Sequence, residues 1–330
     1  MPLAGLPAAA IAKFRESLSG IVSPEALDHD RFGIAVSGGP DSLALLALSA
    51  AALPGRIIAA TVDHGLRVES AAEANAVAAL CARFSVPHHI IELDWPCPPD
   101  GNRQALSREA RYYRLGTWAL DLGVKYVATA HHLDDQAETL MMRLHRGAGV
   151  AGLAGVRIRR LLMKRHEQSV DLVRPLLYWR RRDLQAVIDA CGIEPIDDPS
   201  NHDPRYDRTR ARAFLEASPE WPSRTKMAES ARYLGEADRA LEWTAHYFFR
   251  ERNGWDGEAY NLRVTDLPPE LQRRVMLETI GMMVDREPDG PTVTRALDEL
   301  RKGAVVTLCE VVVRPSEGLW HFEWAPPRRS

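Results

Sequence analysis

Short apolar segments alternate with helical patterns throughout the first half of the chain, and this alternation limits the fold more than any other feature. Residues 32–36, 56–62, 88–93 and 125–130 have the composition of buried strands, and residues 43–52, 70–84, 104–122 and 134–146 that of helices. Strands separated by helices form parallel sheets through right-handed crossovers, and near-continuous apolar strands indicate a sheet covered on both faces. The sequence therefore predicts an α/β fold with a doubly wound, mostly parallel sheet.

The alternation fades after residue 146. Residues 147–155 form a Gly-rich connector, an edge strand is expected at 172–176, and a helix at 181–191 is ended by Gly192. Beyond Phe214 the pattern is helical as far as Asp285, and a last strand is expected at 305–313. Because Pro219 and Pro222 mark a boundary, we expect a catalytic domain over residues 1–217 and a smaller, mainly helical domain over 218–330.

Composition excludes several classes of protein. The longest mostly apolar run, residues 43–53, is too short for the ~20 residues of a membrane-spanning helix, and the N-terminus lacks the pattern of a signal peptide. The four cysteines are scattered without a Cys-x-x-Cys pair, as is typical of a protein in the reducing cytoplasm without a structural zinc ion. We therefore expect a cytoplasmic protein with no membrane partner.

The overall charge of -3 does not indicate a nucleic-acid-binding protein, but charge is unevenly distributed. Residues 151–215 contain 13 Lys or Arg against 9 Asp or Glu. Charge alone does not distinguish a solvated basic face from a surface that binds RNA phosphates. Trp179, beside three arginines, can stack on a base, although a tryptophan in the core is the more ordinary interpretation.

A glycine turn between the first strand and the first helix is the clearest chemical signal. Ser37, Gly38, Gly39, Pro40, Asp41 and Ser42 form it. Glycines let backbone amides converge on a pyrophosphate, and the following helix adds its positive end. Asp41 would repel phosphate without a bridging cation, so it implies Mg²⁺. The spacing matches neither a Walker A loop nor the dinucleotide fingerprint.

A second polar segment follows the fourth strand, at the edge of the sheet where ligands bind. It runs from Thr129 to Thr139 as Thr-Ala-His-His-Leu-Asp-Asp-Gln-Ala-Glu-Thr. Asp135 and Glu138 are three residues apart on the expected helix, so both can face one site. Paired carboxylates there suit a divalent metal or proton abstraction from an amine, although acids also cap helix starts.

Together these motifs resemble the PP-loop of the ATP pyrophosphatase superfamily, and within it the tRNA(Ile)-lysidine synthase family. Further segments with this resemblance are Asp63-His64-Gly65-Leu66-Arg67, Arg108-Glu109-Ala110-Arg111-Tyr112, residues 143–156, Arg174-Pro175-Leu176-Leu177, Asp198-Pro199-Ser200-Asn201, and Tyr206 with Arg208, Arg210 and Arg212. The resemblance is dense over residues 30–215 and implies a Rossmann-like PP-loop ATPase domain with ATP at the carboxyl edge of the sheet.

The chain departs from the family pattern in three places. Thr209 and Ala211 replace Asn and Ile in the Arg-rich stretch, and Thr307-Leu308-Cys309-Glu310 replaces Thr-Leu-Gly-Gly. The chain also ends without the full second C-terminal domain of longer members. These departures bear on tRNA docking more than on chemistry.

The resemblance implies a two-step ligation. ATP adenylates the C2 oxygen of the wobble cytidine in the CAU anticodon of tRNA(Ile), and free L-lysine then displaces AMP. It assigns ATP contacts to the glycine turn with Val62 and His64, Mg²⁺ to Asp41 and Asp135, and catalysis to Asp41, Arg111, Asp135 and Glu138. The expected substrate and tRNA contacts are Arg108, Arg111, His132, Asp134, Asn201, Arg208, Arg210 and Arg212. We also expect tRNA binding by the second domain, and a homodimer.

Three alternatives stay open at this point. A tRNA 2-thiolation enzyme belongs to the same branch, but it typically has paired cysteines. An amidotransferase-type synthetase uses the same nucleotide chemistry. A non-catalytic ATP-binding module would not need the carboxylates after the fourth strand.

Overall fold

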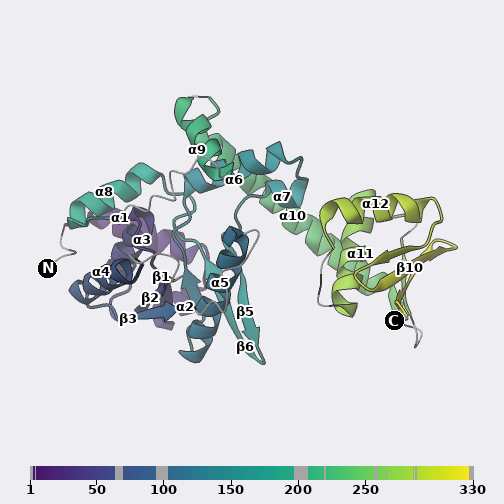
Figure 1. Ribbon diagram of the computed structural model, residues 1–330, viewed down its shortest axis with the longest axis horizontal. Helices are drawn as coiled ribbons and strands as arrows, with labels where there is room; N and C mark the ends of the chain where they lie inside the picture. The colour runs from purple at the N-terminus through teal and green to yellow at the C-terminus, as the bar shows by residue number, and fades with distance from the viewer. Residues whose placement is uncertain are drawn as a thin grey trace. The chain divides into compact units, whose positions relative to one another are not determined.

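The computed structural model divides the chain into two compact units, residues 1–235 and 236–330 (Figure 1). It describes residues 3, 5–63, 70–93, 103–196, 207–218, 221–255, 257, 259–264, 266–284, 286 and 288–326. The first unit runs beyond the expected boundary at 217–218, because the start of helix α10 (Arg224–Arg252) buries Ala228 and Ala231. Among the described residues, no helix is long and apolar enough to cross a membrane.

The first unit is built on a central sheet, which has six strands in the described part of the chain and the order β3-β2-β1-β4-β6-β5. Strands β1 (Phe32–Ala35), β2 (Ile57–Asp63), β3 (His88–Glu92), β4 (Tyr126–Ala128) and β6 (Gln168–Val173) are parallel, and β5 (Arg159–Arg165) is antiparallel. The chain order reverses between β1 and β4. Ligands of such sheets bind at this point, outside the carboxyl ends of the strands.

Helices cover both faces of this sheet, as expected from its apolar strands. On one face lie α1 (Ala8–Ser19), α2 (Pro24–His29), α3 (Pro40–Ala52), α4 (Ser70–Arg83) and α8 (Arg181–Cys191), which share a core with Ile57 and Ala59. On the other face α5 (Arg103–Asp121) packs Leu115 and Trp118 against Ile58 and Ala60. Consecutive residues of β2 thus enter opposite cores, and the expected doubly wound α/β fold is confirmed.

The edge of the sheet differs from the expectation. The strand expected at 172–176 is β6, which pairs with β4 on one side and with β5 on the other, so β5 forms the edge. Its sequence, Arg-Arg-Leu-Leu-Met-Lys-Arg, is too basic to indicate a strand by composition. Charged side chains are nevertheless usual on edge strands, because they oppose pairing with another sheet.

Three more helices complete the first unit. Helix α6 (Leu133–His145) follows β4, and the short α7 (Val150–Leu153) lies in the expected connector. Helix α9 (Asp207–Ala217) packs against α6. Helix α10 then begins in the first unit and ends in the second.

The second unit combines helices with a sheet that was expected only in part. Its helices α11 (Pro269–Met283) and α12 (Gly290–Arg301) pack on one face of an antiparallel sheet, which in the described residues has the order β7-β8-β11-β10-β9. Helical residues outnumber extended ones, in line with the expectation. The strands are β7 (Asn253–Trp255), β8 (Tyr260–Arg263), β9 (Val306–Leu308), β10 (Val311–Ser316) and β11 (Leu319–Trp324). Such short strands give too little alternation to stand out in a sequence.

The strand expected at 305–313 is a hairpin. Leu308 pairs with Val311, so Cys309 and Glu310 alone form the turn between β9 and β10, and their φ angles are 46° and 69°. A two-residue turn with two positive φ angles favours glycine or asparagine at both positions. Two glycines, the pair expected from the family pattern, would relieve this conformation, so the departure at these residues falls on a turn.

Candidate active site

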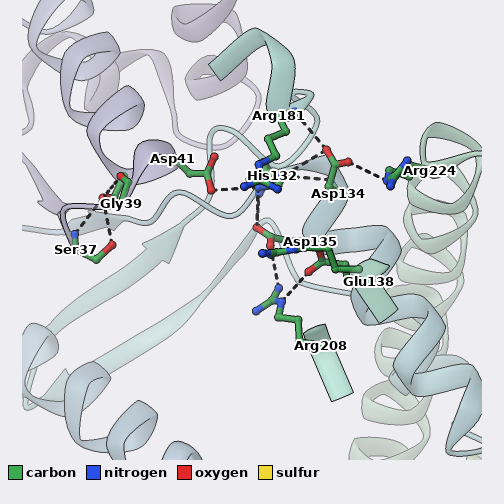
Figure 2. Close-up of polar contacts among 12 residues, drawn as sticks. Ser37, Gly39, Asp41, His132, Asp134, Asp135, Glu138, Arg181, Arg208 and Arg224 are labelled. Carbon is green, nitrogen blue, oxygen red and sulfur yellow. Dashed lines mark hydrogen bonds and ion pairs between the residues drawn. The ribbon is translucent and has the colours of Figure 1, made fainter. Parts of the chain in front are cut away.

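The glycine turn joins β1 to α3, and Gly39 immediately precedes the helix (Figure 2). Pro40 is the first residue of α3. The Ser42 hydroxyl accepts hydrogen bonds from the Ser37 amide at 3.1 Å and the Ser37 hydroxyl at 3.2 Å, and it donates to the Gly39 carbonyl at 2.9 Å. Ser42 belongs to the turn that is expected to contact ATP, and here its proton holds the turn together. The backbone amides at the start of α3 have no carbonyl groups of a preceding helical turn as hydrogen-bond acceptors, so they can bind an anion.

The two glycines of the turn serve different purposes. Gly38 has a φ of +86°, so the backbone favours glycine there, and an added Cβ atom would lie 2.6 Å from Ile196 Cδ1, which would have to shift. Gly39 has a φ of −73°, which any residue adopts, and an added Cβ would come no closer than 3.8 Å to a described atom. Since folding does not demand glycine at 39, the open space above it is consistent with the close approach of a ligand.

The turn meets the start of α6 through His132. Because β1 and β4 are neighbours, their carboxyl ends bring Asp41 and His132 together, with 3.4 Å between Asp41 Oδ2 and His132 Nε2 (Figure 2). The same nitrogen lies 3.8 Å from Asp135 Oδ2, which also accepts a hydrogen bond from the His132 amide at 2.9 Å. His132 caps α6 and connects the two carboxylates that were predicted to bind a metal.

The groups around His132 favour its protonated form. Its side chain is buried, which opposes protonation, but hydrogen bonds to Asp134 and Asp41 and the charge of Asp135 outweigh burial and raise its pKa to about 10. When the ring is neutral, Nδ1 accepts a hydrogen bond from the Asp134 amide at 3.2 Å. When the ring is protonated, Nδ1 is a donor and lies 3.6 Å from Asp134 Oδ2. Positive charge thus lies between three carboxylates.

Asp134 has a structural position. Its Oδ2 accepts a hydrogen bond from the Arg181 amide at the start of α8 at 3.3 Å, and its Oδ1 lies 3.2 Å from Arg224 Nε on α10 (Figure 2). Burial raises the pKa of Asp134, but His132 and these partners outweigh burial and lower it below its usual value. Asp134 therefore ties two helices, α8 and α10, to the site on α6, and its predicted contact with substrate stays a prediction.

Glu138 and two arginines of the expected tRNA-binding stretch form one ion cluster. Glu138 is buried; its Oε2 accepts from Arg208 Nε at 2.8 Å and its Oε1 from Arg212 Nε at 2.8 Å. Arg208 also donates to Asp135 Oδ1 at 3.0 Å (Figure 2). The stretch is helical, so Arg208 and Arg212 share a face and point at α6. Here they neutralise two carboxylates that were predicted to take part in catalysis.

Arg210 lies elsewhere on the same helix. It is exposed and pairs with Asp207, which also pairs with Arg146. Arg108 and Arg111 project from α5 toward the ring of Tyr112, at 5.1 and 5.2 Å from its centroid. The structure thus separates the predicted arginines into a group beside α6, a group around Tyr112, and the exposed Arg210.

Of the three remaining predicted contacts, the structure describes only Val62. Val62 is half-buried near the carboxyl end of β2, on the edge where ligands bind. His64 and Asn201 lie outside the described residues. In the described part of the chain, no group of three or more His, Cys, Asp or Glu can hold a metal by itself.

Sequence reasoning missed the residues that surround Tyr112. Arg174 and Tyr112 belong to segments that resemble the family, but no function was predicted for them. For Arg160 and His131 the sequence offered only their charge and their position along the chain. Arg174 Nε donates to His131 Nδ1 at 3.3 Å, and Arg160 lies 4.8 Å from the Tyr112 centroid. These residues come from β4, β5, β6 and α5 or the segments next to them, so only the fold brings them together.

Comparison with known proteins places these motifs in a family. Residues 11–218 match the PP-loop domain. Over 322 residues the chain is 44% identical to a tRNA(Ile)-lysidine synthase from Novosphingobium aromaticivorans, covering 96% of this chain and 97% of that protein. A tRNA(Ile)-lysidine synthase from Zymomonas mobilis is 39% identical over 318 residues, covering 96% and 94%.

A solved structure supports the fold alone. A U34-tRNA thiolase from Methanococcus maripaludis superposes with a TM-score of 0.57 at 17% identity, covering 69% of this chain and 80% of that chain. That protein was solved with its [4Fe-4S] cluster. In this chain Cys81 and Cys191 are buried and unpaired, and burial raises the pKa of the Cys81 thiol to about 12. A thiolate is therefore disfavoured at Cys81.

Proposed function

The chain belongs to the tRNA(Ile)-lysidine synthase family of PP-loop enzymes, and from this membership we propose that it ligates free L-lysine to C2 of the wobble cytidine in the CAU anticodon of tRNA(Ile). The cytidine C2 oxygen attacks the α-phosphorus of ATP, and pyrophosphate leaves. The lysine amine then attacks C2, loses a proton, and AMP leaves with the former C2 oxygen.

One structural observation carries this proposal. Asp41 of the glycine turn and Asp135 of α6 both lie within 4 Å of His132 Nε2, at 3.4 and 3.8 Å. The phosphate-binding turn and the acidic helix thus form one site at the point where the strand order of the sheet reverses. An adenylation site needs this arrangement, because the reacting oxygen must meet the α-phosphate beside the group that receives the amine.

The donor set of this site fits Mg²⁺. Two carboxylates are too few to enclose a metal, but Mg²⁺ usually binds to one or two carboxylates, with water and substrate phosphates completing its shell. Asp41 and Asp135 would hold the ion, which would offset phosphate charge as the bond to pyrophosphate breaks.

The protein groups have separate tasks in this proposal. The amides at the start of α3 bind and orient the phosphates, and Arg111, which lies beside Tyr112, offers positive charge to the adenylated nucleotide. Glu138 receives the lysine ammonium, which must enter beside Arg208 or displace it, because Arg208 donates to Glu138 as well as to Asp135. Glu138 can then take the proton that the amine loses.

The wobble base must leave the anticodon stack to reach the site. Arg210 and Arg146 are exposed and suit contacts to the tRNA backbone, and tRNA binding by the second unit stays a prediction. The homodimer and the cytoplasmic location stay predictions.

The test is release of pyrophosphate from ATP in the presence of unmodified tRNA(Ile) and lysine. We expect release to require the tRNA, and lysidine formation to require both the tRNA and lysine. The matched control is the same tRNA with the wobble cytidine replaced by uridine, which should give neither product. Release that is indifferent to tRNA, or transfer of sulfur instead of lysine, would contradict the proposal.

A further inference from the structure

Tyr112 lies at the centre of a group of arginines from different elements. The guanidinium carbons of Arg108, Arg111 and Arg160 lie 5.1, 5.2 and 4.8 Å from the centroid of its ring. Arg174, which follows β6, faces the same group. We call Tyr112 and these four arginines the arginine cluster. Arg174 and Tyr112 are buried, Arg111 and Arg160 are half-buried, and Arg108 is exposed, so the cluster reaches from the protein interior to solvent.

The arginine cluster contains donors without matching acceptors. In the part of the chain that the structure describes, none of its arginines lies within ion-pair distance of a carboxylate. Arg174 donates instead to the Arg157 carbonyl and to His131 Nδ1. The Tyr112 hydroxyl is buried beside the Arg174 guanidinium, and no described group accepts its proton. Buried arginines and hydroxyls are normally paired, so this grouping lacks an anion.

The electrostatics agree with this interpretation. Burial lowers the pKa of Arg174 to about 10, with help from the charges of Arg160 and Arg108. Burial acts on Arg208 too, but there Asp135 and Glu138 outweigh it and raise the pKa. Arg208 thus has the negative partners that the arginine cluster lacks.

We propose that the arginine cluster binds a backbone phosphate of the substrate tRNA, close to the nucleotide that reacts. The planar guanidinium groups match the oxygens of a phosphate, and the Tyr112 hydroxyl can donate to one of them. This inference rests on the proposed function, because it requires an RNA substrate at the neighbouring carboxylates. Arg108 at the exposed end is reachable by a macromolecule.

Position in the sheet favours tRNA over the phosphates of ATP. The glycine turn supplies amides for ATP after β1, and the expected nucleotide contact Val62 lies near the end of β2, on the side of β1 away from β4. Arg174 follows β6, two strands from β1 in the other direction, or roughly 10 Å at the usual strand spacing. ATP that is bound at the glycine turn and extends toward β2 therefore lies on the opposite side of β1 from the arginine cluster.

The test compares Arg160→Gln and Tyr112→Phe with Arg31→Gln. Arg31 is exposed and immediately precedes β1, at the amino ends of the strands, whereas the site lies at their carboxyl ends. Arg31→Gln therefore removes one positive charge at a position far from the site. Binding of unmodified tRNA(Ile) to the full chain is measured over a range of salt concentrations. We expect Arg160→Gln to weaken binding roughly tenfold and to reduce the log–log salt slope by about 0.7–0.9. Tyr112→Phe should weaken binding with an unchanged slope, and Arg31→Gln should match wild type.

Two other results would overturn the inference. If Arg160→Gln leaves the salt slope unchanged but raises the KM for ATP or weakens inhibition by added pyrophosphate, the anion belongs to the nucleotide. If Arg160→Gln and Tyr112→Phe both bind tRNA and ATP as wild type does, the arginine cluster holds no ligand phosphate. If the wild-type protein binds tRNA with the expected salt dependence but forms no lysidine, the proposed function is contradicted while the phosphate site is still supported.

Discussion

Replacing Glu138 with glutamine should release α9 from α6. The carboxylate is buried and receives one hydrogen bond from Arg208 and one from Arg212, each at 2.8 Å. Glutamine keeps one acceptor oxygen and turns an N–H₂ group toward the other guanidinium, so one charge-assisted hydrogen bond is lost. Such a bond contributes roughly 1.5–3 kcal/mol. The arginine side chains are 38% and 29% exposed, which lets water compensate in part, so we expect a loss of about 2 kcal/mol.

The assay is urea unfolding, followed on the transition of the first unit, because the two units need not unfold together. Arg212→Gln and the double variant complete a thermodynamic cycle, in which a coupling of about 1–2 kcal/mol between Glu138 and Arg212 is expected. Glu16→Gln, an exposed acid on α1, is the control and should change stability by less than about 0.5 kcal/mol. The reasoning would be refuted if the stability losses of the two single variants add up to that of the double variant. It would also be refuted if Glu138→Gln changes stability no more than the control does.

The same variant tests the chemistry. If Glu138 receives the lysine amine, single-turnover reactions with labelled ATP should show adenylated tRNA accumulating without lysidine, since an ammonium cannot attack. If Glu138 only supports Mg²⁺ binding, adenylation itself should fail. Unimpaired lysidine formation would leave Glu138 with the sole task of holding α9.

Three further predictions concern the site and the second unit. Asp41→Asn should abolish pyrophosphate release at saturating Mg²⁺ with an unchanged circular dichroism spectrum, because it removes an acid predicted to hold the ion beside the phosphates; near wild-type turnover would exclude this role. Folding raises the pKa of His132 from 6.5 to about 10, so its stabilisation is complete below about pH 6.5 and is lost as the pH rises toward 10. Without Mg²⁺, wild type should therefore lose up to about 1.4 kcal/mol per pH unit more than His132→Gln between pH 7 and 9, and parallel stability curves would contradict this. Glu310→Gly should raise the stability of the second unit by about 1 kcal/mol in thermal unfolding, because it relieves a φ of 69°, and a loss of stability would show that the turn is not strained.

Local patterns in the sequence were sufficient for the framework of the first unit. The alternation of apolar strands with helices predicted a doubly wound sheet, since both periods arise within a few residues of the backbone. The same reasoning predicted that the glycine turn and the acids after β4 share an edge, because the carboxyl ends of parallel strands meet there. Strand β5 escaped prediction, because an edge strand is defined by its neighbour more than by its own composition.

The partners of the charged side chains were decided by the tertiary structure. Residues 208, 210 and 212 alternate in sequence, and nothing local determined whether they would share a face; their helical conformation turns Arg208 and Arg212 toward α6 and leaves Arg210 exposed. Glu138 lies 70 residues from Arg208, so the pairing depends on where two helices meet. Likewise, nothing in the spacing of Tyr112, Arg160 and Arg174 indicated that they converge. A sequence determines local conformation through short-range sterics and periodicity, whereas the energy of a charge depends on every group that folding brings within a few ångströms of it.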